Sequence, residues 1–159
     1  MRCSSWCSED PEPTTIAYYP PAVSRKIPKW SSQLPDNEKS LLDEVYTAMH
    51  AESLRLAMMG ARSLIDVALV STVGDQGSFG KTLAEGESKG FISSKNRTVL
   101  DAAFDAGSAA AHRGHRATLE QVEQVMDIAE NLLHSVYVLP SLANDLRAVT
   151  PQRQLKSRP

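Results

Sequence analysis

The most reactive group of side chains in this sequence is a short cationic run around two histidines. His112-Arg113-Gly114-His115-Arg116 follows a stretch made almost entirely of Ala, Gly and Ser. Histidine titrates near neutral pH, and arginine stabilises a phosphorane-like anionic transition state, so the run could serve acid–base chemistry or bind an anion. With Ser108 it is the predicted ligand-binding site. The simpler interpretation is that cationic side chains in a last helical turn favour the negative end of the helix.

A second candidate pair, Arg62 and Asp66, lies four residues apart within a helical pattern. Such a pair forms an ordinary surface ion pair of about 0.3–0.5 kcal/mol. Alternatively, the pair is partly buried and orients a histidine from another helix. In that arrangement Arg62, Asp66 and His112 meet in one cleft, and His112 has Arg62 or Asp66 within reach of a hydrogen bond or one bridging water.

Metal and cofactor chemistry find little support in the residue spacing. Cys3 and Cys7 are separated by three residues rather than the two of a zinc knuckle, and no further cysteine follows. His112 and His115 have no carboxylate partner at a recognisable spacing. Glycine-rich phosphate loops and Gly-x-Ser-x-Gly elbows are absent from the sequence. We expect no metal and no cofactor.

The distribution of proline indicates which part of the chain must be helical. No proline occurs between Pro35 and Pro140, and an interior proline would cost a helix about 3 kcal/mol. Residues 1–35, which contain Tyr18-Tyr19-Pro20-Pro21, are predicted to form an extended proline-rich arm with its aromatic side chains over the helical body. Residues 36–148 are predicted to form a helical bundle, and residues 149–159 a basic tail.

Apolar residues recur at helical spacing throughout the body, and capping residues mark the ends. The pattern predicts about five helices. The first starts at Asp36, the second runs from Leu54 to near Gly74, and the third covers Phe79 to Lys89. The fourth is capped by Ser93 or Ser94 and ends at Gly114, and the fifth runs from the capping box Thr118-x-x-Gln121 to Pro140. Gly107 within the fourth helix needs an explanation, because glycine there costs about 1 kcal/mol against alanine. A close approach of another helix, or space for a ligand beside Ser108, would supply it.

Length and charge exclude several classes of protein. The chain has 159 residues and a net charge of −2, which fits one domain and argues against a whole-chain cationic binder. Residues 36–140 hold nine Lys and Arg against fifteen Asp and Glu, a net charge of −6, while residues 141–159 carry +3. Nucleic-acid contacts must therefore be local. Without a long apolar run or a disulfide framework, the expected location is the cytoplasm, with no membrane partner.

Four short pieces of the sequence, in this order and spacing, resemble the domain of unknown function 4145 family, in the wider HEPN-like group of helical proteins. The resemblance covers roughly residues 18–140, and the pieces are Tyr19-Pro20-Pro21 before Pro28-Lys29-Trp30, then Leu56 to Arg62 with Asp66, then Gly90-Phe91-Ile92, and then Asp105 to Gly114. It implies an all-α HEPN-like bundle. It also implies a two-fold homodimer with the His112 clusters near the interface, and a defence-operon protein as a further partner.

The resemblance leaves two functions open. The first is a non-catalytic binding or regulatory module, accessory to phage defence or nucleic-acid metabolism, with RNA or a nucleotide as ligand. The second is a metal-independent ribonuclease with His112 as general base and Arg62 or Arg113 as the phosphate-stabilising cation. HEPN ribonucleases carry an arginine four to six residues before the histidine, and positions 106–108 hold none. This departure favours the non-catalytic module.

Overall fold

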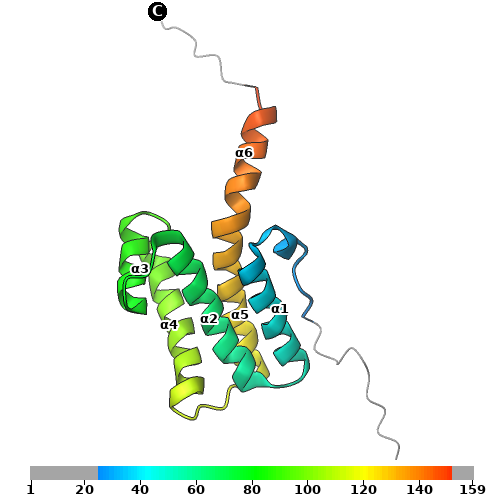
Figure 1. Ribbon diagram of the computed structural model, residues 1–159, viewed down its shortest axis with the longest axis vertical. Helices are drawn as coiled ribbons and strands as arrows, with labels where there is room; N and C mark the ends of the chain where they lie inside the picture. The colour runs from blue at the N-terminus through cyan, green and yellow to red at the C-terminus, as the bar shows by residue number, and fades with distance from the viewer. Residues whose placement is uncertain (1–24, 152–159) are drawn as a thin grey trace, which may run out of the picture.

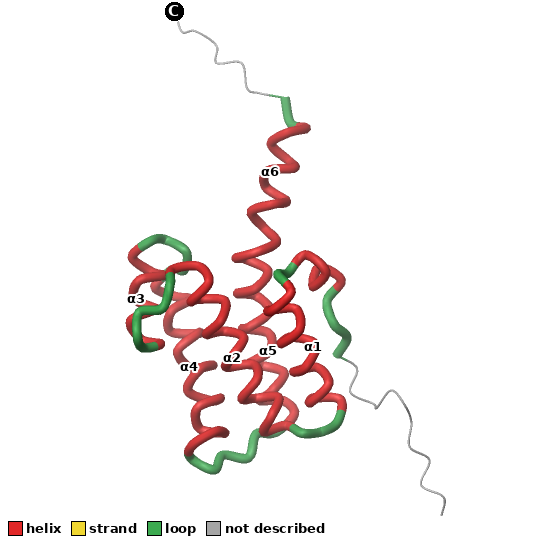
Figure 2. The backbone as a smooth tube through the Cα atoms, in the orientation of Figure 1, coloured by secondary structure: helices red, strands yellow, loops and turns green. Residues whose placement is uncertain are grey.

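The computed structural model describes residues 25–151, and within this range every regular element is helical. Figure 1 and Figure 2 show the helices arranged as an upright bundle from which the last helix projects. The elements are the 3₁₀ helix Lys29–Gln33 and the α-helices α1 (Asp36–His50), α2 (Leu54–Val73), α3 (Phe79–Ser88), α4 (Ser94–His112), α5 (Leu119–Leu133) and α6 (Leu139–Val149). The all-α prediction is confirmed. Residues 1–24, which include most of the predicted arm, and residues 152–159 of the tail lie outside the described range.

Most helix ends fall where the capping residues predicted them. The Ser93 side chain accepts a hydrogen bond from the backbone of Asn96 at the start of α4. Thr118 and Gln121 form the complete capping box at the start of α5. Gly74 and Gly114 follow α2 and α4 with positive φ angles of 81° and 69°. These local signals act within one or two turns, which is why the sequence alone located them.

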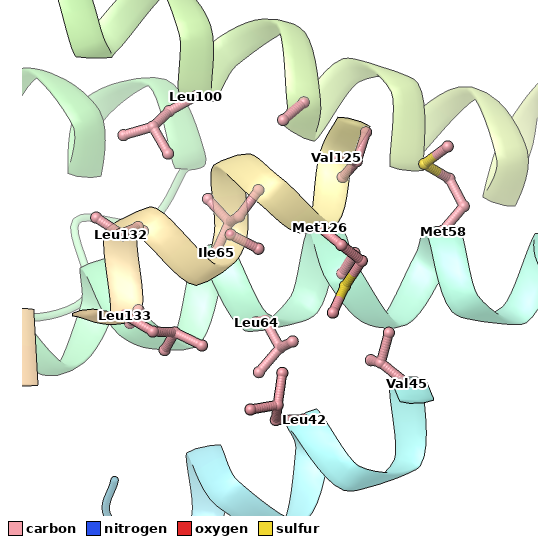
Figure 3. Close-up of a cluster of buried hydrophobic side chains, with 14 of the residues drawn as sticks. Leu42, Val45, Met58, Leu64, Ile65, Leu100, Val125, Met126, Leu132 and Leu133 are labelled. Carbon is pink, nitrogen blue, oxygen red and sulfur yellow. The ribbon is translucent and has the colours of Figure 1, made fainter. Parts of the chain in front are cut away.

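The core is built around α2, which packs against α1, α3, α4 and α5. Figure 3 shows Leu64 and Ile65 of α2 among side chains from α1, α4 and α5. By length and apolar composition α2 would also pass as a membrane-spanning segment. Its central position explains that composition, because eight of its residues are buried inside the bundle.

The C-terminal end of the bundle differs from the prediction of one helix ending at Pro140. After Leu133 the chain makes a π-helical turn over His134–Val138 and continues directly as α6. Pro140 lies in the first turn of α6, where a missing N–H and a fixed φ are tolerated. The helix therefore passes through the proline, and α6 is an additional helix that stands beyond the others (Figure 1).

The described part of the arm also departs from the predicted extended chain. Residues 29–33 form the 3₁₀ helix, and Trp30 packs edge-on against His134, with 5.2 Å between the ring centroids. Arg25 reaches α5, where its guanidinium pairs with Asp127 at 2.8 Å and with Glu130 at 2.9 Å. These residues of the arm therefore lie against the helical body. The predicted contacts of Tyr18 and Tyr19 fall outside the described range.

Candidate functional site

Arg62 forms the polar contact between α2 and α4. Its Nε donates a hydrogen bond to the Ser108 hydroxyl at 3.1 Å. Its guanidinium carbon lies 4.2 Å from the centroid of the Phe104 ring, a cation–π distance. Phe104 in turn stacks on Phe79 of α3, with ring centroids 3.4 Å apart and planes 6° from parallel. One half-buried guanidinium thus connects three helices.

Gly107 makes this contact possible, and a close helix approach was one of the two explanations that the sequence left open for a glycine inside this helix. A Cβ built at position 107 would overlap with Cβ of Arg62 and would lie 3.1 Å from the backbone oxygen of Met58. Both obstacles are fixed to the α2 backbone and cannot rotate away. Gly107 is therefore required because α2 and α4 approach closely, and Ser108 beside it is occupied by Arg62 rather than by an open ligand cavity.

The predicted cleft of Arg62, Asp66 and His112 is not formed by direct contacts. α2 and α4 run antiparallel (Figure 1), and Arg62 faces Ser108. Asp66 is four residues after Arg62, and His112 is four residues after Ser108. At 1.5 Å per residue, Asp66 lies about 6 Å along the helix axis from the Arg62–Ser108 contact toward one end of the bundle, and His112 lies about 6 Å from it toward the other end. Within residues 25–151, neither Asp66 nor His112 shares a hydrogen bond or ion pair with Arg62. The surface ion pair expected for Arg62 and Asp66 is absent there as well.

The remaining residues of the cationic run lie on the loop between α4 and α5. Arg113 is held back on α4 by Asp105, whose carboxylate it meets at 2.8 Å and whose backbone oxygen it contacts at 3.0 Å. His115 is half-buried and lies 3.2 Å from the Gln121 side chain of the capping box. His112 and Arg116 are exposed. Within the described range, these two are the side chains of the run that face solvent without a hydrogen bond or ion pair.

Arg116 borders an open hollow at the beginning of α2. The hollow is also lined by Arg55, Ser53 and Glu52. The N-terminal end of a helix carries free N–H groups and a partial positive charge, and no side chain caps α2 here. Of the predicted ligand residues, Arg116 is the one that lines this hollow, together with a second arginine, Arg55.

Sequence reasoning missed a polar network between α1 and α5. The Tyr46 hydroxyl donates to the Glu130 carboxylate at 2.7 Å, and the same carboxylate pairs with Arg25. Burial and the bond to Glu130 raise the pKa of the Tyr46 hydroxyl well above its usual value. The pKa of Arg25 also rises, because hydrogen bonds to Tyr46 and the carboxylates outweigh the opposing effect of burial. This network holds Arg25 and Lys26 on the bundle.

A second missed network connects the π-helical turn to α1 and α2. The Tyr137 hydroxyl donates to the Glu38 carboxylate at 2.7 Å and also contacts the Ser71 hydroxyl. Glu38 is only 5% exposed. Burial, supported by the bond to Glu38 and opposed by Ser71, raises the pKa of Tyr137 to about 12. Helical spacing could have placed Glu38 on the buried face of α1, four residues before Leu42, but nothing in the sequence indicated the tyrosine.

Metal binding gains no support from the described residues. Residues 25–151 contain no group of three or more His, Cys, Asp or Glu side chains arranged to hold a metal ion. Cys3 and Cys7 lie outside this range.

Fold and contacts together define an all-helical protein in which a half-buried arginine joins two antiparallel helices across a glycine. The model of the family described as Domain of unknown function (DUF4145) matches residues 43–149, about two thirds of the chain. The chain belongs to this family. The comparisons with curated proteins and with solved structures gave no match.

Proposed function

We propose that this protein is a non-catalytic HEPN-like binding and regulatory module, accessory to nucleic-acid metabolism or to bacterial phage defence. The observation that carries the proposal is the position of Arg62. Its guanidinium is bonded to Ser108 and lies on Phe104, so it serves the packing of α2 against α4. The HEPN-like character and the link to defence rest on the sequence resemblance.

Cleavage of RNA without a metal needs a base near the 2′-hydroxyl and a fixed cation near the scissile phosphate. His112 is exposed at the end of α4, one helical turn beyond the Arg62–Ser108 contact. Arg113, the other candidate cation, is paired with Asp105. Both arginines are thus engaged with protein partners rather than aimed at a phosphate next to a 2′-hydroxyl that His112 could deprotonate, and this supports the non-catalytic function.

Binding of a phosphate-bearing ligand is supported by the exposed polar side chains near the loop between α4 and α5. His112 and Arg116 face solvent, and Arg116 shares a hollow with Arg55 at the start of α2. Because the bundle as a whole is acidic, such binding would depend on these few residues and would weaken as salt is raised. RNA or a nucleotide is the ligand class that this surface fits.

The test is an assay of labelled single-stranded RNA with the purified full chain in EDTA, read both for cleavage and for fluorescence anisotropy. We expect no cleavage by the wild type or by His112→Ala. We expect weak, salt-dependent binding that falls several-fold in Arg116→Ala. Lys95→Ala is the matched control, because Lys95 is exposed at the opposite end of α4.

Two results would contradict the proposal. Cleavage by the wild type that is lost in His112→Ala would establish the ribonuclease alternative, with His112 as the base. Equal loss of RNA binding in Lys95→Ala and Arg116→Ala would show that binding is not localised at the loop between α4 and α5.

A further inference from the structure

The most unusual surface of the molecule is the apolar face of α6. No residue of α6 is buried. Its exposed residues include four large apolar ones, and Leu139, Leu142, Leu146 and Val149 are 46%, 42%, 64% and 77% exposed. Their spacing of three, four and three residues places all four on one side of the helix, as in a helix that packs against another helix. Figure 1 shows α6 extending beyond the bundle with no neighbouring helix along it. Within residues 25–151, this stripe has no partner.

A groove of complementary character lies at the base of the same helix, between α4 and α5. It has a volume of about 200 Å³ and is lined by the apolar side chains Phe91, Ile92, Val99, Leu100, Ile128 and Leu132. Phe91 and Val99 are large apolar residues that remain 54% and 45% exposed. Exposed apolar groups that gather around a groove are typical of a protein interaction site.

We propose that α6 of one molecule packs into the α4–α5 groove of a second copy, and that the two copies exchange these helices about a two-fold axis. The inference goes beyond the proposed function and does not depend on RNA binding. Because α6 continues the direction of α5 through the π-helical turn, it points away from its own groove (Figure 1). An antiparallel second copy would lay each α6 along the C-terminal half of the other's α5.

The lengths of the two surfaces agree. Eleven residues give α6 a length of about 16 Å, and the groove follows α5 from Asp127 to Ser135, about 12 Å. With a two-fold axis near Leu139, Leu146 of one copy lies level with Leu132 of the other. Each α6 would then bring Leu142 and Leu146 opposite the apolar part of the groove.

Buried area and charge also favour a second copy as the occupant. Half the surface of a helix of this length is roughly 250 Å², so two symmetric contacts bury roughly 1,000 Å² in total, about the minimum for a specific interface. Asp127 stands at the rim of the groove with a side chain 72% exposed. Arg147 stands on the last turn of α6. Arg147 of one copy could therefore meet the exposed Asp127 carboxylate of the other.

This arrangement moves the dimer interface away from the position that the sequence suggested. The small-residue face around Gly107 is covered by α2 and cannot pair with another molecule. The groove lies near the start of α4, and the sixteen residue-to-residue steps from Asn96 to His112 span about 24 Å. The two His112 clusters would therefore lie far from the proposed interface.

The experiment measures the mass of the full chain by light scattering at tens of micromolar. We expect twice 17.4 kDa for the wild type. Leu146→Asp on α6 and Val99→Lys in the groove should each give the monomer. Leu56→Asp is the control, because Leu56 is 61% exposed on α2 at the other end of the bundle, and this variant should remain dimeric. Circular dichroism checks that all variants keep the helical content of the wild type.

Cross-linking then identifies the contact itself, with Cys3 and Cys7 changed to Ser. A mixture of Leu146→Cys and Val99→Cys chains should form a disulfide between the two chains. A monomeric wild type would overturn the proposal and leave α6 for a different protein. A dimer that survives Val99→Lys, or that cross-links through Leu146→Cys alone, would show that α6 pairs with α6 and would also overturn it.

Discussion

Two regions of the bundle are held together by opposite kinds of polar contact. Between α2 and α4, a cation meets neutral partners, since Arg62 bonds to the Ser108 hydroxyl and lies on the Phe104 ring. Where α1 meets α5 and the π-helical turn, buried or nearly buried carboxylates meet tyrosine hydroxyls, in the pairs Glu130 with Tyr46 and Glu38 with Tyr137. Only the first contact involves residues that the sequence had marked.

The difference lies in how the helices reach one another. The α2–α4 contact depends on the absence of a side chain at Gly107, so the backbones come close and a flexible arginine bends along the interface. The carboxylate contacts are instead made by the hydroxyls of long, rigid tyrosine side chains. Side chains of either sign can be accommodated between helices provided that each receives partners, because an unpaired buried charge would cost several kcal/mol.

The largest effect should come from adding one methyl group at the closest point of α2 and α4. We expect Gly107→Ala to lower the free energy of unfolding by about 2–3 kcal/mol, since the overlap with Arg62 exceeds the gain in helix propensity. Gly80→Ala is the matched control: a Cβ at this position of α3 meets nothing within 4 Å, so stability should rise by up to about 1 kcal/mol. Urea unfolding measures both, and equal effects would refute the close-approach explanation.

A somewhat smaller loss should follow removal of the hydroxyl that serves the buried carboxylate. Tyr137→Phe leaves Glu38, only 5% exposed, without its hydrogen-bond donor. We expect a loss of about 1–3 kcal/mol in urea unfolding at neutral pH. The double variant Tyr137→Phe with Glu38→Gln should recover part of the lost stability, because it removes the unpaired carboxylate charge. No recovery would mean that the loss in Tyr137→Phe does not come from the Glu38 carboxylate.

The same tyrosine should make stability depend on pH in a defined alkaline window. Its pKa rises from 10 in the unfolded chain to about 12 in the folded protein, so the folded state keeps the proton longer. The contribution of Tyr137 to the free energy of unfolding is therefore full below pH 10 and is lost as pH rises toward 12. Between these values the wild type should lose stability more steeply than Tyr137→Phe. Parallel curves for the two proteins would contradict the shifted pKa.

The smallest effect should be that of Tyr46→Phe. Glu130 loses one hydrogen bond but keeps Arg25 at 2.9 Å, so the charge remains paired. We expect a loss of about 1 kcal/mol in the same urea experiment. A loss larger than that of Tyr137→Phe would show that the tyrosine, and not Arg25, carries the contact with Glu130.

Local features of the fold could be predicted from the sequence. The starts of α1, α4 and α5, the ends of α2 and α4, and the need for space at Gly107 all follow from capping, turn and propensity rules that operate over a few residues. The passage of the helix through Pro140 was not predictable in this way. A proline usually ends a helix, and the π-helical turn before it is an exception that spacing does not reveal.

For the candidate site, the sequence determined which residue types were available, and the tertiary structure decided how they are used. Arg62 and Ser108 were both candidates, but only the antiparallel packing of α2 and α4 pairs them. The same packing places Asp66 and His112 toward opposite ends of the bundle. Neither Tyr46 nor Tyr137 was a candidate in the sequence, and only the packing of α1 against α5 and the π-helical turn brings their hydroxyls to Glu130 and Glu38. Contacts between residues tens of positions apart depend on the angles and distances between helices, and those are fixed by the packing of the whole core rather than by any local rule.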